Sequence, residues 1–254
     1  MNGKPTLVAF DLDGTLAESK QPVTTDLGTL LARLMKKMPV AVMSGAGFRQ
    51  FESQFLPALP SDANFNNLYL FPANASQCYQ NNNQNNKGVW LHVYDETFTQ
   101  LERERVLHAL AEALEETGLA EPPPQLWGDQ IEDRGSQISW SALGQQAPVE
   151  EKKKWDPDRK KRLPLREAFL KRAPDFSAGI NASNTLDITR KGVTKAYGIG
   201  KLSELTGISV SEMLYVGDAL KEGGNDYVVV QTGIRTQEVS GPIETAKIIG
   251  EILA

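Results

Sequence analysis

The sequence predicts an α/β fold in which a parallel sheet is interrupted by an inserted α+β domain. Short apolar runs at residues 6–10 and 40–43 are typical of buried parallel strands, and each leads directly into small or polar residues. Between them, residues 26–37 carry leucines at helical spacing, which indicates the alternation of strands and helices of an α/β core. A length of 254 residues accommodates such a core together with a second, smaller domain.

The core elements follow in order along residues 1–76 and 189–254. We expect strands at residues 6–10, 40–43, 68–71, 213–216 and 227–230. We expect helices at residues 26–37, 196–206 and 244–253. Thr24, Thr25 or Asp26 is a suitable cap for the first helix, and Pro242 is a natural first-turn residue for the last.

The middle of the chain, residues 77–188, lacks this rhythm and is predicted to form the inserted domain. We expect strands at residues 75–80, 89–94, 130–133, 137–143, 176–180 and 185–188. Helices are expected at 101–117 and 163–172, and the Asn/Gln tract at 81–86 is expected to be a hairpin loop. Helices set against hairpins are typical of an α+β module.

The composition excludes several classes of protein. With 27 basic and 32 acidic residues the formal net charge is −5, whereas nucleic-acid binding requires a basic surface. Cys78 is the only cysteine, so there is no disulfide framework and no cysteine-based zinc site. No apolar run approaches the roughly 18–20 residues of a membrane span, and no signal-peptide core is evident. We therefore expect a cytoplasmic protein with neither nucleic-acid nor membrane partners.

Three of the predicted strands end in residues suited to phosphate chemistry. Asp11 and Asp13 follow the first strand, Ser44 follows the second, and Asp218 follows the strand at 213–216. The carboxyl ends of parallel strands meet at one edge of a sheet, so these groups converge. An oxygen cluster without His or Cys suits Mg²⁺, and Ser44 together with Lys195 can hold phosphoryl oxygens.

These segments resemble the motifs of the haloacid dehalogenase superfamily of aspartyl phosphotransferases. All four motifs occur in order: residues 10–16 (Phe-Asp-Leu-Asp-Gly-Thr-Leu), 42–45 (Val-Met-Ser-Gly), Lys195, and Gly217-Asp218 with Asp226. The resemblance implies a Rossmann-like core with a parallel sheet and an inserted α+β cap of the C2b type, as in subfamily IIB.

The same resemblance implies roles for the acidic residues. Asp11 is expected to be the nucleophile that forms an aspartyl phosphate, and Asp13 the general acid and base. Mg²⁺ is expected to be bound by the Asp11 carboxylate, the Asp13 backbone carbonyl and Asp218. Asp226 is expected to be a further ligand of Mg²⁺ or a residue that contacts the ligands. Asn225 is left open as a residue that orients Asp226 or that binds Mg²⁺ through water.

Within subfamily IIB, residues 217–226 look most like the eukaryotic-type phosphomannomutases. That likeness implies substrate-binding roles for Lys20, Arg134, Lys152, Thr185 and Asp187. For Arg134, pairing with Asp133 is the open structural alternative.

The sequence departs from the phosphomannomutase pattern in the cap. Gln145 stands where a phosphate-binding arginine is expected, and Lys152 replaces a planar guanidinium with a point charge. A weaker hold on the distal phosphate favours water as the acceptor, so we expect a Mg²⁺-dependent phosphohydrolase acting on a sugar phosphate. The alternative is a phosphomannomutase that interconverts mannose 1-phosphate and mannose 6-phosphate, and a catalytically silent sugar-phosphate-binding module is a third possibility. The protein is expected to be a monomer or a homodimer formed through the cap.

Overall fold

The computed structural model describes residues 3–18, 21–82, 89–181 and 184–254. The chain divides into two compact units. Unit 1 comprises Met1–Asp95 and Thr194–Ala254, and unit 2 comprises Glu96–Val193. The chain therefore leaves unit 1 once and returns to it once.

Unit 1 is built on one largely parallel sheet. Its strands are β1 (Leu7–Asp11), β2 (Val40–Met43), β3 (Leu68–Phe71), β4 (Gln77–Asn82), β5 (Val89–Asp95), β10 (Met213–Gly217) and β11 (Arg235–Glu238). In the described residues the sheet order is β11-β10-β1-β2-β3-β4-β5, with β4 and β5 antiparallel to their neighbours. The predicted α/β class with a parallel sheet is confirmed.

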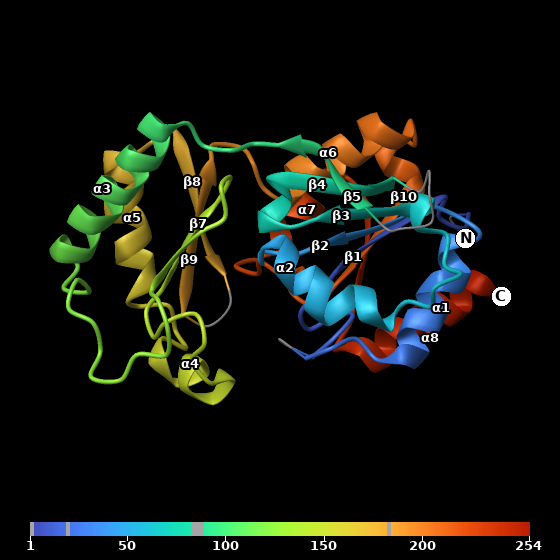
Figure 1. The fold of residues 1–254 in the computed structure, drawn as a ribbon, viewed down its shortest axis with the longest axis horizontal. Helices are drawn as coiled ribbons and strands as arrows, with labels where there is room; N and C mark the ends of the chain where they lie inside the picture. The colour runs from blue at the N-terminus through green and yellow to red at the C-terminus, as the bar shows by residue number, and fades with distance from the viewer. Residues whose placement is uncertain (1–2, 19–20, 83–88, 182–183) are drawn as a thin grey trace. The chain divides into compact units, whose positions relative to one another are not determined.

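Helices cover both faces of this sheet (Figure 1). They are α1 (Thr25–Met35), α2 (Phe48–Gln50), α6 (Lys195–Thr206), α7 (Tyr227–Val230) and α8 (Pro242–Leu253). Alternate side chains of β1 point to opposite faces, so Val8 and Phe10 pack with α1 and α8, whereas Leu7 and Ala9 pack with α6 and α7. Thr24 caps α1, because its side chain accepts a hydrogen bond from the Leu27 amide at 3.3 Å.

Unit 2 is a smaller antiparallel sheet with its two long helices on one face (Figure 1). Its elements are α3 (Gln100–Glu116), β6 (Ile131–Asp133), β7 (Ile138–Ser141), α4 (Val149–Trp155), α5 (Arg162–Arg172), β8 (Phe176–Asn181) and β9 (Thr185–Arg190). The described strands lie in the order β6-β7-β9-β8. Ile138, Trp140, Leu186 and Ile188 pack against α3 and α5, so the alternating residues Ser139, Ser141, Thr185 and Asp187 belong to the opposite, polar face.

Several sequence predictions differ from the structure. Residues 227–230, expected to be a strand because of three consecutive valines, form the short helix α7, and the strand is instead the polar segment β11. An apolar run this short does not distinguish a strand from a helical turn. The segment β11 lies at the edge of the sheet and is mostly exposed, so a strand can form there from polar residues. The hairpin of β4 and β5, expected in the insert, pairs with β3 and belongs to unit 1.

The helical segment that follows β2 was not predicted from the sequence. It begins with α2 and continues through a π-helical turn (Phe51–Phe55) and a 3-10 turn (Leu56–Ala58). The charged residues 150–162 contain most of α4 and the first residue of α5.

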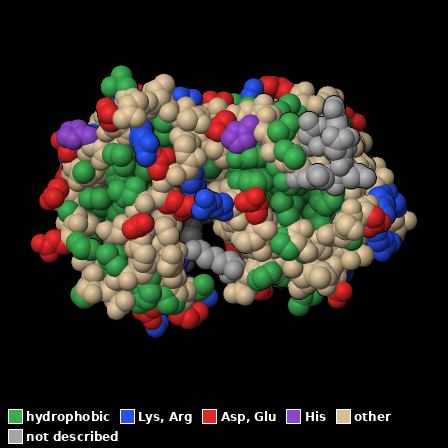
Figure 2. All heavy atoms as spheres, viewed as in Figure 1, with side chains coloured by type: hydrophobic (Ala, Val, Ile, Leu, Met, Phe, Trp, Pro, Cys, Tyr) green, Lys and Arg blue, Asp and Glu red, His purple; other side chains and the backbone are tan. Residues whose placement is uncertain are grey.

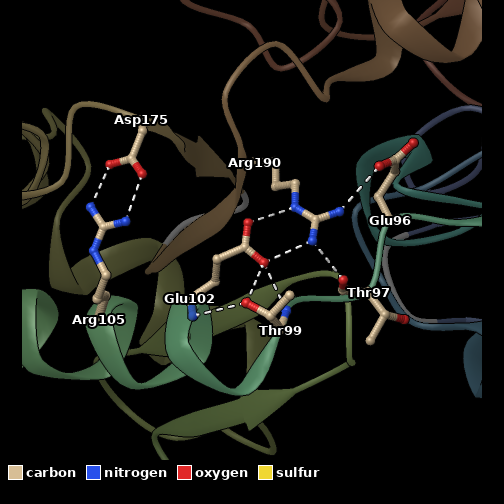
Figure 3. A network of polar contacts seen from close by, with 7 residues as sticks. All are labelled: Glu96, Thr97, Thr99, Glu102, Arg105, Asp175 and Arg190. Carbon is tan, nitrogen blue, oxygen red and sulfur yellow. Dashed lines mark hydrogen bonds and ion pairs between the residues drawn. The ribbon is translucent and has the colours of Figure 1, made fainter.

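Arg190 joins the beginning and the end of unit 2 (Figure 3). Its guanidinium donates to Glu102 at 2.7 and 2.9 Å, to Glu96 at 3.3 Å and to the Thr97 carbonyl at 2.8 Å. The hydrogen bonds from Arg190, followed by the one from the Thr99 amide, lower the pKa of Glu102 to about 2.

No helix in the described part of the chain is both long enough and apolar enough to cross a bilayer. The side chains of both histidines lie on the surface, 43% exposed for His92 and 77% for His108 (Figure 2). Neither histidine belongs to the cluster of acidic residues described below.

Candidate active site

The carboxyl ends of β1, β2 and β10 bring the predicted motif residues to one edge of the unit 1 sheet. Asp11 is the last residue of β1 and pairs in register with Met43, so Ser44 follows on the adjacent strand. On the other side β10 pairs with β1 in parallel and ends at Gly217, directly before Asp218. Parallel pairing is therefore the reason that residues separated by more than 200 positions share a site.

A buried lysine joins two of the acidic side chains. Lys195, the first residue of α6, is 1% exposed. Its Nζ donates a short hydrogen bond to Asp11 Oδ1 and a second one to Asp226 Oδ1, at 2.6 Å. Asp226 Oδ1 also accepts a hydrogen bond from the Tyr215 hydroxyl at 2.8 Å. The Lys195 ammonium therefore donates to both carboxylates, and the Tyr215 hydroxyl donates to that of Asp226 as well.

The electrostatics of the cluster show an excess of buried negative charge. Burial raises the pKa of Asp11 well above its usual range, although Lys195 opposes the shift. Burial, followed by the charge of Asp226, raises the pKa of Asp218 to about 6. Burial alone would lower the pKa of Lys195, but the Asp11 and Asp226 carboxylates outweigh that effect and raise it. Lys195 therefore stays a cation beside the Asp11 carboxyl group, whose pKa burial raises.

The donor set fits a hard divalent cation. Carboxylate oxygens of Asp11, Asp218 and Asp226 lie within 4.8 Å of one another. Asp226 Oδ2 is buried and has no hydrogen-bond partner among the described residues, so it is an acceptor available to a cation. Three carboxylates and the Lys195 ammonium leave a formal charge of minus two, which a divalent cation balances.

Two glycines keep this cluster open. Gly14 has φ +85°, and a Cβ there would collide with Asp218 Oδ2. At Gly217 a Cβ would lie 2.5 Å from Asp226 Oδ2 and 2.8 Å from Tyr215 Cε1. Any larger residue at either position would displace a carboxylate of the cluster.

Asp13 is held by two glutamine amides that sequence analysis did not identify. Gln50 Nε2 donates to Asp13 Oδ2 at 2.8 Å, and Gln54 Nε2 donates to Asp13 Oδ1 at 3.2 Å. The two glutamines also hydrogen-bond to each other through a short contact. Their spacing of four residues across α2 and the π-helical turn places both amides on the same side of the helix. That spacing is the only sequence signal for them.

In unit 2 the predicted substrate-binding residues occupy the polar side of the sheet and its flanking segments. Asp187 Oδ1 accepts a hydrogen bond from Ser139 at 2.6 Å, and Thr185 lies two residues before Asp187 on β9. Lys152, in α4, is 7% exposed and its Nζ donates to the Gln145 carbonyl at 3.0 Å.

Arg134 lies in the turn between β6 and β7. It pairs with Glu132 at 2.6 Å, whereas Asp133, its expected alternative partner, pairs with Arg103 at 2.5 Å. Lys20 lies outside the described residues.

Comparison with known proteins assigns the family. The family model for eukaryotic phosphomannomutases matches residues 27–254, which include all of unit 2. The chain belongs to the eukaryotic phosphomannomutase family. It is 25% identical over 256 residues to the phosphomannomutase of Encephalitozoon cuniculi, covering 98% of this chain and 93% of that protein. It is 27% identical over 262 residues to the phosphomannomutase of Spinacia oleracea, covering 99% and 98% of the two.

Solved structures share the fold of this phosphomannomutase family member. An N-terminally truncated IMP-nucleotidase of Plasmodium falciparum has a TM-score of 0.73 at 18% identity, over 98% of this chain and 70% of that one. A haloacid dehalogenase-like hydrolase from Bacteroides thetaiotaomicron has a TM-score of 0.64 at 14% identity, over 98% and 100%. The predicted resemblance to the haloacid dehalogenase superfamily is confirmed, and the protein is an enzyme of phosphotransferase or phosphatase type.

Proposed function

We propose that this protein is a phosphomannomutase that interconverts mannose 1-phosphate and mannose 6-phosphate. The observation that carries the proposal is the extent of the family match, because residues 27–254 include unit 2 as well as most of unit 1. A match to unit 1 alone would support any phosphatase built on this core, since one fold hosts many substrates. The mutase therefore has more support than the phosphohydrolase that sequence analysis favoured.

In the proposed reaction, Asp11 forms a covalent intermediate. One carboxylate oxygen of Asp11 attacks phosphorus, the bond from phosphorus to the sugar oxygen breaks, and an aspartyl phosphate results. Lys195 and Ser44 balance the charge of the phosphoryl oxygens. The Ser44 Oγ accepts the Ala46 amide at 3.1 Å, which leaves its own proton for donation to the substrate.

Asp13 moves the proton in each half of the reaction. Its carboxyl group gives a proton to the departing sugar oxygen and takes one from the incoming hydroxyl, which forms the new bond to phosphorus as Asp11 is released. When the phosphoryl group of Asp11 passes to the free hydroxyl of mannose 1-phosphate, the sugar bisphosphate forms. The bisphosphate then turns around, its other phosphoryl group passes back to Asp11, and mannose 6-phosphate is released as the aspartyl phosphate is regenerated. With water as acceptor, the product is inorganic phosphate.

The cation that we propose for the carboxylate cluster is Mg²⁺. Asp11, Asp218 and Asp226 would hold it together with the Asp13 backbone carbonyl, and when bound it would neutralise phosphoryl charge. We further propose that Arg134 and Lys152 bind the distal phosphate, and that Thr185 and Asp187 bind sugar hydroxyls. Each of these side chains offers the donor or acceptor that its proposed partner requires.

One reaction with two readouts tests the proposal. Purified protein, Mg²⁺ and mannose 1-phosphate, with and without a hexose bisphosphate activator, are assayed for mannose 6-phosphate and for phosphate. Mannose 6-phosphate in excess is the expected result. Phosphate alone would overturn the mutase in favour of the hydrolase, the outcome that the glutamine at position 145 favours.

The nucleophile is tested with a matched pair of variants. Asp11→Asn should abolish both products, because an amide oxygen does not form the aspartyl phosphate. Asp62→Asn, which alters a side chain 74% exposed in a surface ion pair, should leave both products unchanged. Turnover by Asp11→Asn would exclude the aspartyl-phosphate mechanism.

A further inference from the structure

The two oxygens of the Asp226 carboxylate have different surroundings. Oδ1 accepts hydrogen bonds from Lys195 at 2.6 Å and from the Tyr215 hydroxyl at 2.8 Å. Oδ2 is buried without a hydrogen-bond partner among the described residues, and Gly217 leaves open the space beside it. The carboxylate is therefore oriented, with one oxygen committed to the protein and the other left as an acceptor.

Lys195 alone does not account for this orientation. Its ammonium is shared with Asp11, to which it donates a short hydrogen bond. The terminal torsion of an aspartate is broad and roughly two-fold, so one shared donor leaves the carboxylate free to rotate. A second donor at the same oxygen restricts that rotation.

The position of Tyr215 makes its hydroxyl a fixed donor. Tyr215 lies on β10, which is paired on both sides with β1 and β11, and its side chain is fully buried among residues of the sheet and of α6 and α7. A buried ring has little freedom to move its hydroxyl away from Asp226. A tyrosine phenol, with an ordinary pKa of about 10, is a neutral donor at neutral pH.

We propose that Tyr215 is a positioning residue of the cation site, directing Asp226 Oδ2 toward the bound metal by holding Oδ1. The inference rests on the proposed binding of Mg²⁺ by Asp11, Asp218 and Asp226. A neutral donor suits this place because a second cation would cancel charge that the metal needs. Groups behind metal ligands commonly contribute 10- to 100-fold to metal affinity, so we expect Tyr215→Phe to weaken Mg²⁺ binding about tenfold.

Calorimetric titration of Mg²⁺ into the metal-free protein tests this inference. Tyr94→Phe is the matched control, because Tyr94 donates a hydrogen bond to the Ala75 carbonyl at 2.7 Å in the same unit and outside the carboxylate cluster. We expect Tyr215→Phe alone to raise the Kd for Mg²⁺, and excess Mg²⁺ to restore turnover. An unchanged Kd for Tyr215→Phe, or an equal loss in both variants, would overturn the role of Tyr215. Absence of binding to the unmodified protein would instead contradict the proposed metal site.

A structure of the unmodified protein with Mn²⁺ gives a second test that does not depend on the folding of a variant. The anomalous signal of Mn²⁺ would locate the ion. We expect Asp226 Oδ2 to face it, directly or through one bound water, while Tyr215 still donates to Oδ1. An ion on Oδ1, or a Tyr215 hydroxyl bonded elsewhere, would refute the inference.

Discussion

Replacing Lys195 with methionine removes the only cation that contacts both Asp11 and Asp226 among the described residues. Coulomb's law with an effective dielectric constant of about 20 gives roughly 6 kcal/mol for one contact at 2.6 Å. The cost of burying the ammonium offsets part of that, and loss of one partner of a buried pair typically costs about 3–5 kcal/mol. The carboxylates relieve some of the loss by binding a proton. We therefore expect Lys195→Met to lower the free energy of unfolding by about 3 kcal/mol at neutral pH without metal.

Urea unfolding with and without Mg²⁺ measures this loss. Lys201→Met is the control on the same helix, because the ion pair of Lys201 with Glu204 is exposed and contributes less than about 1 kcal/mol. Mg²⁺ should stabilise Lys195→Met more than the unmodified protein, since the cluster then carries one more uncompensated negative charge. A loss in Lys195→Met no larger than in Lys201→Met would refute the reasoning.

The stability of Lys195→Met should also depend on pH in a direction that the electrostatics of the cluster predict. Burial already raises the pKa of Asp11 above its value in the unfolded chain, and loss of the ammonium removes the charge that opposes this shift. The folded state then binds more protons, so the stability of the metal-free variant should fall as pH rises from about 4 to 8. A stability that rises over that interval would contradict the electrostatic account.

Gln54→Leu removes a hydrogen bond to the Asp13 carboxylate, a contact worth about 1.5–3 kcal/mol. The substitution should lower kcat about tenfold with little change in KM. An unchanged kcat would exclude a role of Gln54 in orienting Asp13. Arg162→Met breaks the buried ion pair with Asp156 in unit 2 and should lower the free energy of unfolding in urea by about 3–5 kcal/mol. The affinity for Mg²⁺ should not change, because the proposed cation site lies in unit 1. The pKa of Glu102 is lowered from 4.5 to about 2. Its contribution to the free energy of unfolding is therefore fully present above pH 4.5, the ordinary pKa, and is lost as the pH falls toward 2. Because these side chains are partly exposed, Arg190→Met should cost only about 1 kcal/mol at pH 7 and flatten that acid dependence in unfolding measured against pH.

Local patterns predicted most of the core, because a buried parallel strand and an amphipathic helix each carry a strong periodic signal. Residues 40–43 and 68–71 form strands as expected, and the long helix expected at 101–117 is α3. The prediction was wrong at 227–230, where three valines favoured a strand although the segment is one helical turn. A run of four residues has too few positions for its period to distinguish the two conformations.

The sequence by itself determined the chemical inventory of the active site, because Asp11, Asp13 and Asp218 stand at strand ends, and the order of the strands brings such ends to one edge. Only the tertiary structure decided how those groups are supported. The contacts of Gln54 with Asp13 and of Tyr215 with Asp226 join residues 41 and 11 positions apart. Each contact depends on side-chain direction and depth of burial, which follow from how helices pack on the sheet and leave no periodic trace along the chain.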